Sequence, residues 1–194
     1  MSSLYFYHSS MNAGKSTTLL QANYNYHERG MKTLVLKPAI DTREGKPVIR
    51  SRIGLEAECT MFSEYENLFW VIQSLIGLKP NPHCILIDEA QFLTRNQVIQ
   101  LSEVVDQLGI PVLCYGLRSD FQGNLFPGSE ALFALADKLE RVKTICWCGK
   151  SAHMVLRLDS EGKVVREGNQ VDVGGNDKYI SVCRKHFMSG QTHS

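Results

Sequence analysis

A short stretch near the N-terminus, Tyr5–Ser16 (YFYHSSMNAGKS), constrains the fold of this chain more than any other feature. It begins with apolar and aromatic residues, continues through small residues, and ends in GKS followed by a helical pattern. This order predicts a strand, a loop and a helix, in which backbone N–H groups and the lysine face a polyphosphate while the serine hydroxyl holds Mg²⁺. The expected phosphate site comprises Ser9, Ser10, Met11, Asn12, Ala13, Gly14, Lys15 and Ser16.

The loop departs from the usual pattern G-x-x-x-x-G-K-[ST] at its first position, where Ser9 replaces glycine. A serine there costs more than a glycine if the position requires a positive φ angle. The alternative interpretation is a solvated loop that contains the letters GKS by chance. The strand and helix patterns on either side favour the phosphate site.

Short apolar runs alternate with helical segments over the first two-thirds of the chain. Strands are expected at 4–7, 33–36, 84–87 and 111–115, and helices at 16–29, 65–78, 94–108 and 129–139. Strand–helix–strand order favours parallel pairing with right-handed crossovers. The expected fold class is therefore α/β, with a parallel sheet of the P-loop NTPase type flanked by helices.

Two further expectations concern the segments between these strands. The first helix is expected to place Leu20, Tyr24 and His27 on one buried stripe. Residues 37–59 are polar and interrupted by glycine and proline, so they predict a long exposed connection. The charged residues in that connection are Asp41, Arg43, Arg50 and Arg52.

Two carboxylates, Asp88 and Glu89, follow directly after the apolar run Cys84–Ile87. Ligands of open α/β sheets bind outside the carboxyl ends of the strands, so both acids are expected to face the phosphate loop. Asp88 would then hold Mg²⁺ together with Ser16, and Glu89 would act as a base. The alternative is that one of the acids caps the helix that begins near Thr94.

The pattern changes after about residue 141, where short alternating segments replace the strand–helix units. We expect one domain over residues 1–140, which binds the nucleotide, and a small second domain over residues 141–194. The second domain shows no helical core of its own, so a bound metal would stabilise it.

Three cysteines and a histidine in this second domain form a complete ligand set for tetrahedral Zn²⁺: Cys146, Cys148, Cys183 and His186. Because the set leaves no open position, the zinc is expected to be structural. The C-x-C spacing is tighter than the usual C-x₂-C, so two unrelated pairs of buried thiols are the alternative. His153 is a rival ligand.

Composition narrows the possible partners. Lys and Arg number 21 against 20 Asp and Glu, for a net charge of +1, which argues against nucleic acid as a partner. No apolar run approaches the roughly 18 residues of a membrane-spanning helix, and the first residues lack a signal-peptide pattern. We expect a cytoplasmic protein without a membrane partner, whose cysteines suit a metal better than disulfides.

Five motifs then carry a resemblance over essentially the whole chain. In order they are MNAGKST, KPAIDTR, IDEAQFL, CYGLRSDFQG and GGNDKYISVCRKH. Together they resemble the thymidine kinases of the tetrameric, zinc-containing class, and Ser9 suggests a bacterial branch. The resemblance implies transfer of the γ-phosphate of ATP to the 5′-hydroxyl of thymidine or deoxyuridine, in nucleotide salvage for DNA synthesis. It also implies Mg²⁺ with ATP, structural Zn²⁺, a homotetramer and feedback inhibition by dTTP.

The same resemblance assigns roles to residues. Ser9–Ser16 would bind the ATP phosphates, Glu89 would accept the proton, and Arg43 would lie near the phosphates. The second nucleotide and magnesium segment would be Asp88, Glu89, Ala90 and Gln91. The thymidine pocket would have apolar walls and a loop that reads the thymine edge through backbone groups; its residues are Met11, Phe92, Phe121, Gly174, Gly175 and Tyr179.

Other classes of protein fit parts of the pattern. If Glu89 activated water, the chain would be an NTPase, and the letters DEAQ also resemble the acidic motif of helicases. A helicase needs two motor domains and a basic channel, for which this chain has no room. A non-catalytic nucleotide-sensing zinc module would bind ATP without needing Glu89.

Overall fold

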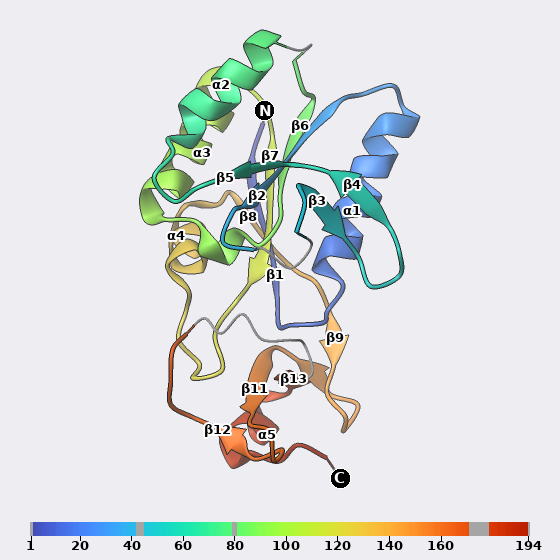
Figure 1. Ribbon diagram of the computed structural model, residues 1–194, viewed down its shortest axis with the longest axis vertical. Helices are drawn as coiled ribbons and strands as arrows, with labels where there is room; N and C mark the ends of the chain where they lie inside the picture. Colours follow the sequence, from blue (N-terminus) through green and yellow to red (C-terminus); the bar gives the residue numbers. More distant parts are fainter. Residues whose placement is uncertain (1, 42–44, 79–80, 171–178, 194) are drawn as a thin grey trace.

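The computed structural model describes residues 2–41, 45–78, 81–170 and 179–193. Its centre is a six-stranded, fully parallel sheet in the order β5-β2-β6-β7-β1-β8 (Figure 1). This arrangement confirms the α/β fold expected from the sequence. The strands are β1 (Leu4–Ser9), β2 (Thr33–Pro38), β5 (Thr60–Phe62), β6 (Cys84–Ile87), β7 (Val112–Leu117) and β8 (Lys138–Arg141).

Helices cover both faces of the sheet (Figure 1). One face carries α2 (Leu68–Leu78), α3 (Arg95–Leu108) and α4 (Pro127–Leu135). The other carries α1 (Lys15–Glu28) and the hairpin of β3 (Val48–Arg50) and β4 (Glu56–Glu58). A single 3₁₀ turn, η1 (Ala90–Phe92), follows β6.

The strand β6 shows why the central strands read as continuous apolar runs. All four of its residues are buried, with Ile85 and Ile87 in the core beneath α2–α4 and Cys84 and Leu86 in the core beneath α1. Side chains alternate between the faces of a strand, so a strand buried on both sides must be apolar at every position.

A small second part lies beyond the carboxyl ends of the sheet strands (Figure 1). It has a short hairpin, a three-stranded sheet in the order β12-β11-β13 and a terminal helix, around a core that includes Leu156, Val182 and Phe187. Its elements are β9 (Thr144–Ile145), β10 (Ser151–Ala152), β11 (Met154–Leu158), β12 (Val164–Val165), β13 (Tyr179–Val182) and α5 (Arg184–Ser189).

The buried stripe expected for the first helix is wrong in two of its three residues. Leu20 is buried, but Tyr24 is 57% exposed and His27 is also exposed. The buried face runs instead through Leu19 and Asn23. Asn23 tolerates burial because its side-chain oxygen accepts a hydrogen bond from Thr33 Oγ1 on β2.

The long exposed connection expected at 37–59 is also wrong in large part. It contains the β3–β4 hairpin, and both Val48 and Ile49 are buried. Lys37 and Asp41 are buried as well, and they form an ion pair at 3.1 Å. Pairing compensates the cost of burying each charge, which polarity alone does not reveal.

Two helix boundaries differ from the expected ones. The segment 65–78 becomes helical only at Leu68, and 129–139 divides into α4, which ends at Leu135, and strand β8. Among the helices of the described ranges, none is both long and apolar enough to cross a membrane.

Candidate active site and metal cluster

The loop between β1 and α1 has the backbone geometry that a phosphate site needs. Asn12 and Gly14 have φ angles of +59° and +83°, and α1 begins directly afterwards at Lys15. Glycine adopts this left-handed region without strain, and asparagine tolerates it better than most residues. The turn directs the N-terminus of α1 into the loop, where unpaired N–H groups favour an anion.

Ser9 costs this loop no backbone strain. It is the last residue of β1, and the only non-glycine residues with positive φ in the described ranges are Asn12 and Glu89. Its hydroxyl donates to the Ser10 carbonyl at 2.9 Å, and the Lys15 Nζ donates to the same carbonyl at 2.9 Å. The Lys15 Nζ also donates to Ser9 Oγ at 3.3 Å, so the serine side chain helps to position the lysine.

Asp88 lies at the carboxyl end of β6, facing the first turn of α1. It is 4% exposed, and its Oδ2 accepts a hydrogen bond from Ser16 Oγ at 2.9 Å. Burial, followed by the charge of Glu89, raises the pKa of Asp88 to about 7. Its Oδ1 is buried and has no hydrogen-bond partner among the described residues. A hard divalent cation between these two oxygen-bearing side chains would satisfy that atom, so the donor set fits Mg²⁺.

Glu89 occupies a strained backbone position with φ +51°. Its Oε2 accepts a hydrogen bond from the Gln91 amide nitrogen, and the Gln91 Oε1 accepts from the backbone N–H of Leu117 on β7. Gln91 approaches β7 this closely because residue 116 is glycine: a Cβ there would lie 2.9 Å from the backbone nitrogen of Gln91 and 3.1 Å from its side-chain oxygen. Two neighbouring strands therefore fix the position of the Glu89 carboxylate.

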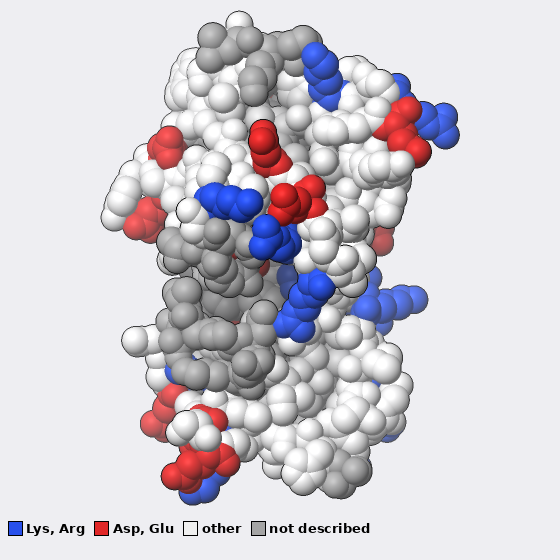
Figure 2. All heavy atoms as spheres, turned by 45° about the vertical axis from the view of Figure 1, so that its right-hand side comes forward, with Lys and Arg blue, Asp and Glu red and all other residues white. Residues whose placement is uncertain are grey.

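A single cavity of about 810 Å³ connects these groups. Figure 2 shows Lys and Arg side chains gathered beside a hollow between the sheet and the second part. Of the expected site residues, the structure places on the cavity wall Met11, Asn12, Gly14, Lys15, Ser16, Asp88, Glu89, Gln91, Phe92, Phe121 and Tyr179. The cavity lining does not include Ser9, Ser10, Ala13 or Ala90.

Aromatic side chains line another part of the same cavity. Phe121 is 1% exposed, and the rings of Phe92 and Phe126 meet edge to face with centroids 6.1 Å apart. Val155 of β11 and Tyr179 of β13 complete this wall from the second part. The cavity thus combines a charged wall with an apolar wall suited to a planar ring.

Some expected site residues are not placed, and some lining residues were missed. Arg43, Gly174 and Gly175 lie outside the described residues. Sequence reasoning missed Lys37, Ile40, Phe126 and Gln170, which all line the cavity. Lys37 and Ile40 belong to the KPAIDTR motif, which could have indicated that they line the site. No motif in the sequence indicated a role for Gln170.

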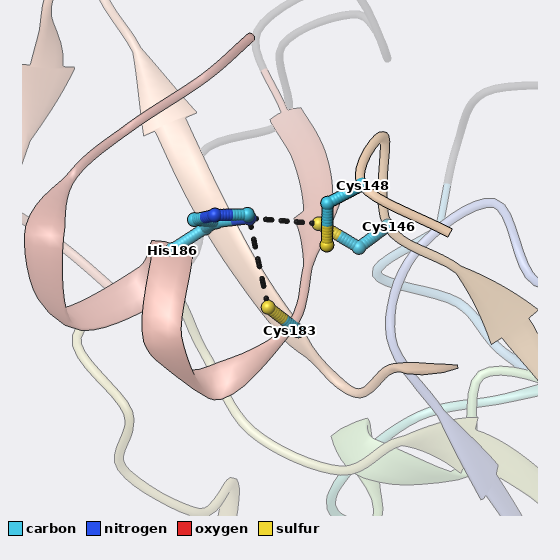
Figure 3. Close-up of side chains that lie close together, drawn as sticks. All are labelled: Cys146, Cys148, Cys183 and His186. Atoms are coloured by element: carbon cyan, nitrogen blue, oxygen red, sulfur yellow. Dashed lines mark hydrogen bonds between the residues drawn. The ribbon is translucent and has the colours of Figure 1, made fainter. Parts of the chain in front are cut away.

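The structure brings the four expected metal ligands together in the second part (Figure 3). Their ligand atoms lie within 4.8 Å of one another, with the Cys146 sulfur 3.2 Å and the Cys183 sulfur 3.6 Å from Nδ1 of His186. The Trp147 ring stacks on the His186 ring, with centroids 4.1 Å apart. Three thiols and an imidazole converging in this way fit a tetrahedral zinc site. His153 is not in the cluster.

The sheet, the phosphate loop and the acidic strand end define a P-loop-type α/β protein of the kind that uses a nucleoside triphosphate, and its second part carries a cluster of residues that could hold a metal ion. A family model described as thymidine kinase matches residues 2–187. The chain belongs to the thymidine kinase family.

Similar proteins cover nearly the whole chain. A thymidine kinase of Rhodopirellula baltica is 59% identical over 187 residues, which cover 96% of this chain and 88% of that protein. The thymidine kinase of Shewanella oneidensis is 58% identical over 96% of this chain and 97% of its own length. That of Mannheimia succiniciproducens is 57% identical over the full length of both chains.

Proposed function

We propose that this protein is a thymidine kinase, which transfers the γ-phosphate of ATP to the 5′-hydroxyl of thymidine or deoxyuridine. The observation that carries the proposal is the single cavity lined by a phosphate loop, a fixed carboxylate and an aromatic wall, in a chain of the thymidine kinase family. Such a cavity holds a phosphate donor and a planar acceptor together, which is what a nucleoside kinase requires.

On the donor side, the loop and the N-terminus of α1 bind the triphosphate. Lys15 neutralises the outer phosphates, while Ser16 and Asp88 would hold Mg²⁺ directly or through water. The cation, when bound with ATP, stabilises the charge that develops on the phosphate oxygens. We assign Arg43 to the same end from the family resemblance.

On the acceptor side, Glu89 removes the proton of the 5′-hydroxyl. The 5′-oxygen then forms a bond to the γ-phosphorus, the bond from that phosphorus to the bridging oxygen breaks, and ADP leaves. Gln91 holds the Glu89 carboxylate at the cavity wall, so the base needs little reorganisation during the reaction.

The nucleoside base packs against the apolar wall. Met11, Phe92 and Phe121 provide contact area, and Tyr179 stands at the start of β13 beside them. Gly174 and Gly175 are assigned to the loop that covers the base, on the family resemblance.

The cysteine–histidine cluster binds a structural zinc ion. All four protein positions of a tetrahedral site are filled by side chains, which leaves no open position for a substrate. The zinc would hold the β9–β10 hairpin and the start of α5 together.

Further features follow from the family and complete the proposal. On the family resemblance we assign to the protein a homotetramer and inhibition by dTTP. We also retain the domain boundary between residues 140 and 141 and the cytoplasmic location expected from the sequence.

The test is a panel of nucleosides incubated with γ-labelled ATP and Mg²⁺. Label transfer to thymidine and deoxyuridine, and little transfer to deoxycytidine or purine nucleosides, is the expected result. ATP hydrolysis without label transfer to any nucleoside would show an NTPase instead.

A further inference from the structure

The strands β11 and β13 form a wall with two faces, between the core of the second part and the cavity. Side chains alternate along each strand, and Leu156 and Val182 point into that core, where both are fully buried. Val155 and Tyr179 take positions of the other face and line the cavity. Ser181 lies two residues beyond Tyr179 and pairs with Val155 in the register, so it belongs to the cavity face as well.

Ser181 connects this wall to the phosphate loop. Its hydroxyl donates a hydrogen bond to the backbone carbonyl of Met11 at 2.5 Å. The side chains of Gln170 and Gln122 also join the second part to the rest of the chain, but their hydrogen bonds involve the loop that follows β7. The contact made by Ser181 therefore joins the acceptor side of the cavity to its donor side.

The Met11 carbonyl also bears on the orientation of the phosphate loop. Because a peptide bond is planar and trans, the N–H of Asn12 points in the direction opposite to the Met11 carbonyl. Asn12 has a φ angle of +59° and lines the cavity, and successive N–H groups of such a loop bind phosphate oxygens. A hydrogen bond to the Met11 carbonyl thus fixes the orientation of a peptide within the expected phosphate site.

We propose that Ser181 is a positioning residue, which holds the acceptor wall at a fixed distance from the phosphate loop and so aligns the acceptor hydroxyl with the transferred phosphoryl group. This inference rests on the proposed function and adds the contact that aligns its two substrates. Val155 and Tyr179 belong to the second part. Lys15 and Glu89 belong to the part that contains the sheet. Without a bond between the two walls each substrate would still bind, but the reacting atoms would meet less often in the geometry that the transfer requires.

The test measures turnover of the full chain with thymidine, ATP and Mg²⁺. In Ser181→Ala we expect kcat to fall ~10- to 100-fold, because a misplacement of about 1 Å has an effect of this size. The KM values for ATP and thymidine should change much less. Water would also compete better for the γ-phosphorus and give ADP and inorganic phosphate, so more ATP should be hydrolysed for each thymidine phosphorylated.

A matched pair of variants isolates the hydroxyl group. Threonine and valine have nearly the same shape and both suit a strand, but only threonine can donate to the Met11 carbonyl. Ser181→Thr should therefore keep most of the kcat, and Ser181→Val should lose it as Ser181→Ala does.

Gln122→Ala is the control for the junction between the two parts. It removes a different hydrogen bond between them, which ends on the Arg166 carbonyl at 3.2 Å, and Gln122 does not line the cavity. Its kcat and its ratio of hydrolysis to thymidine phosphorylation should remain those of the unchanged protein.

The outcomes separate this inference from the proposed function. If the unchanged protein phosphorylates no nucleoside, both fail. If it phosphorylates thymidine, the inference requires both the lower kcat and the higher hydrolysis ratio in Ser181→Val, with neither change in Ser181→Thr. Any other result, including an equal loss in Gln122→Ala, overturns the role of Ser181 and leaves the kinase assignment standing. The comparison of Ser181→Thr with Ser181→Val decides the question even if Ser181→Ala does not fold.

Discussion

Glu89 lowers the stability of the folded protein, as residues that serve function often do. Its left-handed backbone is expected to cost about 1–3 kcal/mol for a non-glycine residue. Its charge also adds to the effect of burial, which is the main cause of the raised pKa of its neighbour Asp88. The sequence revealed these acids, but not the strain, because strain depends on how η1 turns back against β7.

We predict that Glu89→Gln lowers kcat about 10²–10⁴-fold and leaves ATP affinity nearly unchanged. The amide keeps the shape and can still accept from Gln91, but it cannot take the proton of the 5′-hydroxyl. Steady-state turnover and ATP titration measure the two effects. Glu64→Gln is the control, because Glu64 is exposed and does not line the cavity. Full turnover by the Glu89→Gln protein would show that Glu89 is not the base.

His8 provides a pH-dependent prediction at the same scale. Its ring packs against the rings of Phe6 and Phe133, and burial, followed by the charges of Arg118 and Arg141, lowers its pKa to about 4. A histidine with a depressed pKa in the folded state contributes stability that is present above about pH 6.5. That contribution is lost as the pH falls toward 4, because the unfolded chain binds the proton more readily.

We therefore expect the thermal midpoint of the ligand-free protein to fall between pH 7.5 and pH 5, and to fall less in His8→Phe. The comparison uses the difference between the two pH values for each protein, which cancels any packing effect of the new ring. Equal losses in both proteins would show that other groups govern the acid response.

At the scale of elements, the approach of α4 to η1 requires a particular glycine. A Cβ on Gly128 would lie 2.5 Å, 2.7 Å and 2.9 Å from the carbonyl oxygens of Ala90, Leu93 and Gln91. All three are backbone atoms, so the helix would have to move away from the turn that carries Gln91.

We predict that Gly128→Ala destabilises the protein by about 1–3 kcal/mol or more and also lowers turnover. Gly77→Ala is the matched control, because Gly77 lies within α2 and a Cβ there meets nothing within 4 Å. That substitution should stabilise the protein by about 0.5–1 kcal/mol, through the reduced flexibility of the unfolded chain. Denaturant unfolding measures both values, and equal stability of the two variants would contradict the packing argument.

The sequence predicted best those elements whose own residues show a clear pattern, without help from their neighbours in space. β6, with four apolar residues, and α3, with its Thr94–Gln97 capping box and Gly109 at its end, were expected close to their observed bounds. β3, β4 and β5 have three residues each, too few to show a period of two. β8 reads KLER and is exposed throughout, so only its pairing with β1 makes it a strand.

At the scale of the whole molecule, hydrogen bonds among the described residues join the second part to the part that contains the sheet. Ser181 donates to the Met11 carbonyl of the phosphate loop, Gln170 to Asp120, and Gln122 to the Arg166 carbonyl. The cavity therefore has one wall that depends on the sheet alone and another that needs both parts. Sequence placed the metal ligands but could not show these contacts, since each joins residues more than 40 positions apart.

Loss of the proposed zinc ion should affect the cavity wall that needs both parts more than the wall formed by the sheet alone. Cys183 follows β13 and precedes α5, so its loss as a ligand would release the segment that carries Tyr179. The second part has a small core of its own, and a structural metal supplies folding free energy to units of this size. The phosphate loop belongs to the sheet, whose two apolar cores do not include the metal cluster.

We predict that Cys183→Ser, or removal of zinc by chelation under conditions that keep the protein dissolved, weakens thymidine binding much more than ATP binding. Calorimetric titration of each ligand measures the two affinities, and a metal assay should find about one zinc per chain before treatment, for a single tetrahedral site. Cys59→Ser, at a half-buried cysteine outside the cluster, is the control and should keep its zinc. Equal losses for both ligands would mean that the sheet also depends on the metal, and unchanged thymidine binding would mean that the aromatic wall is held by the hydrogen bonds to the sheet alone.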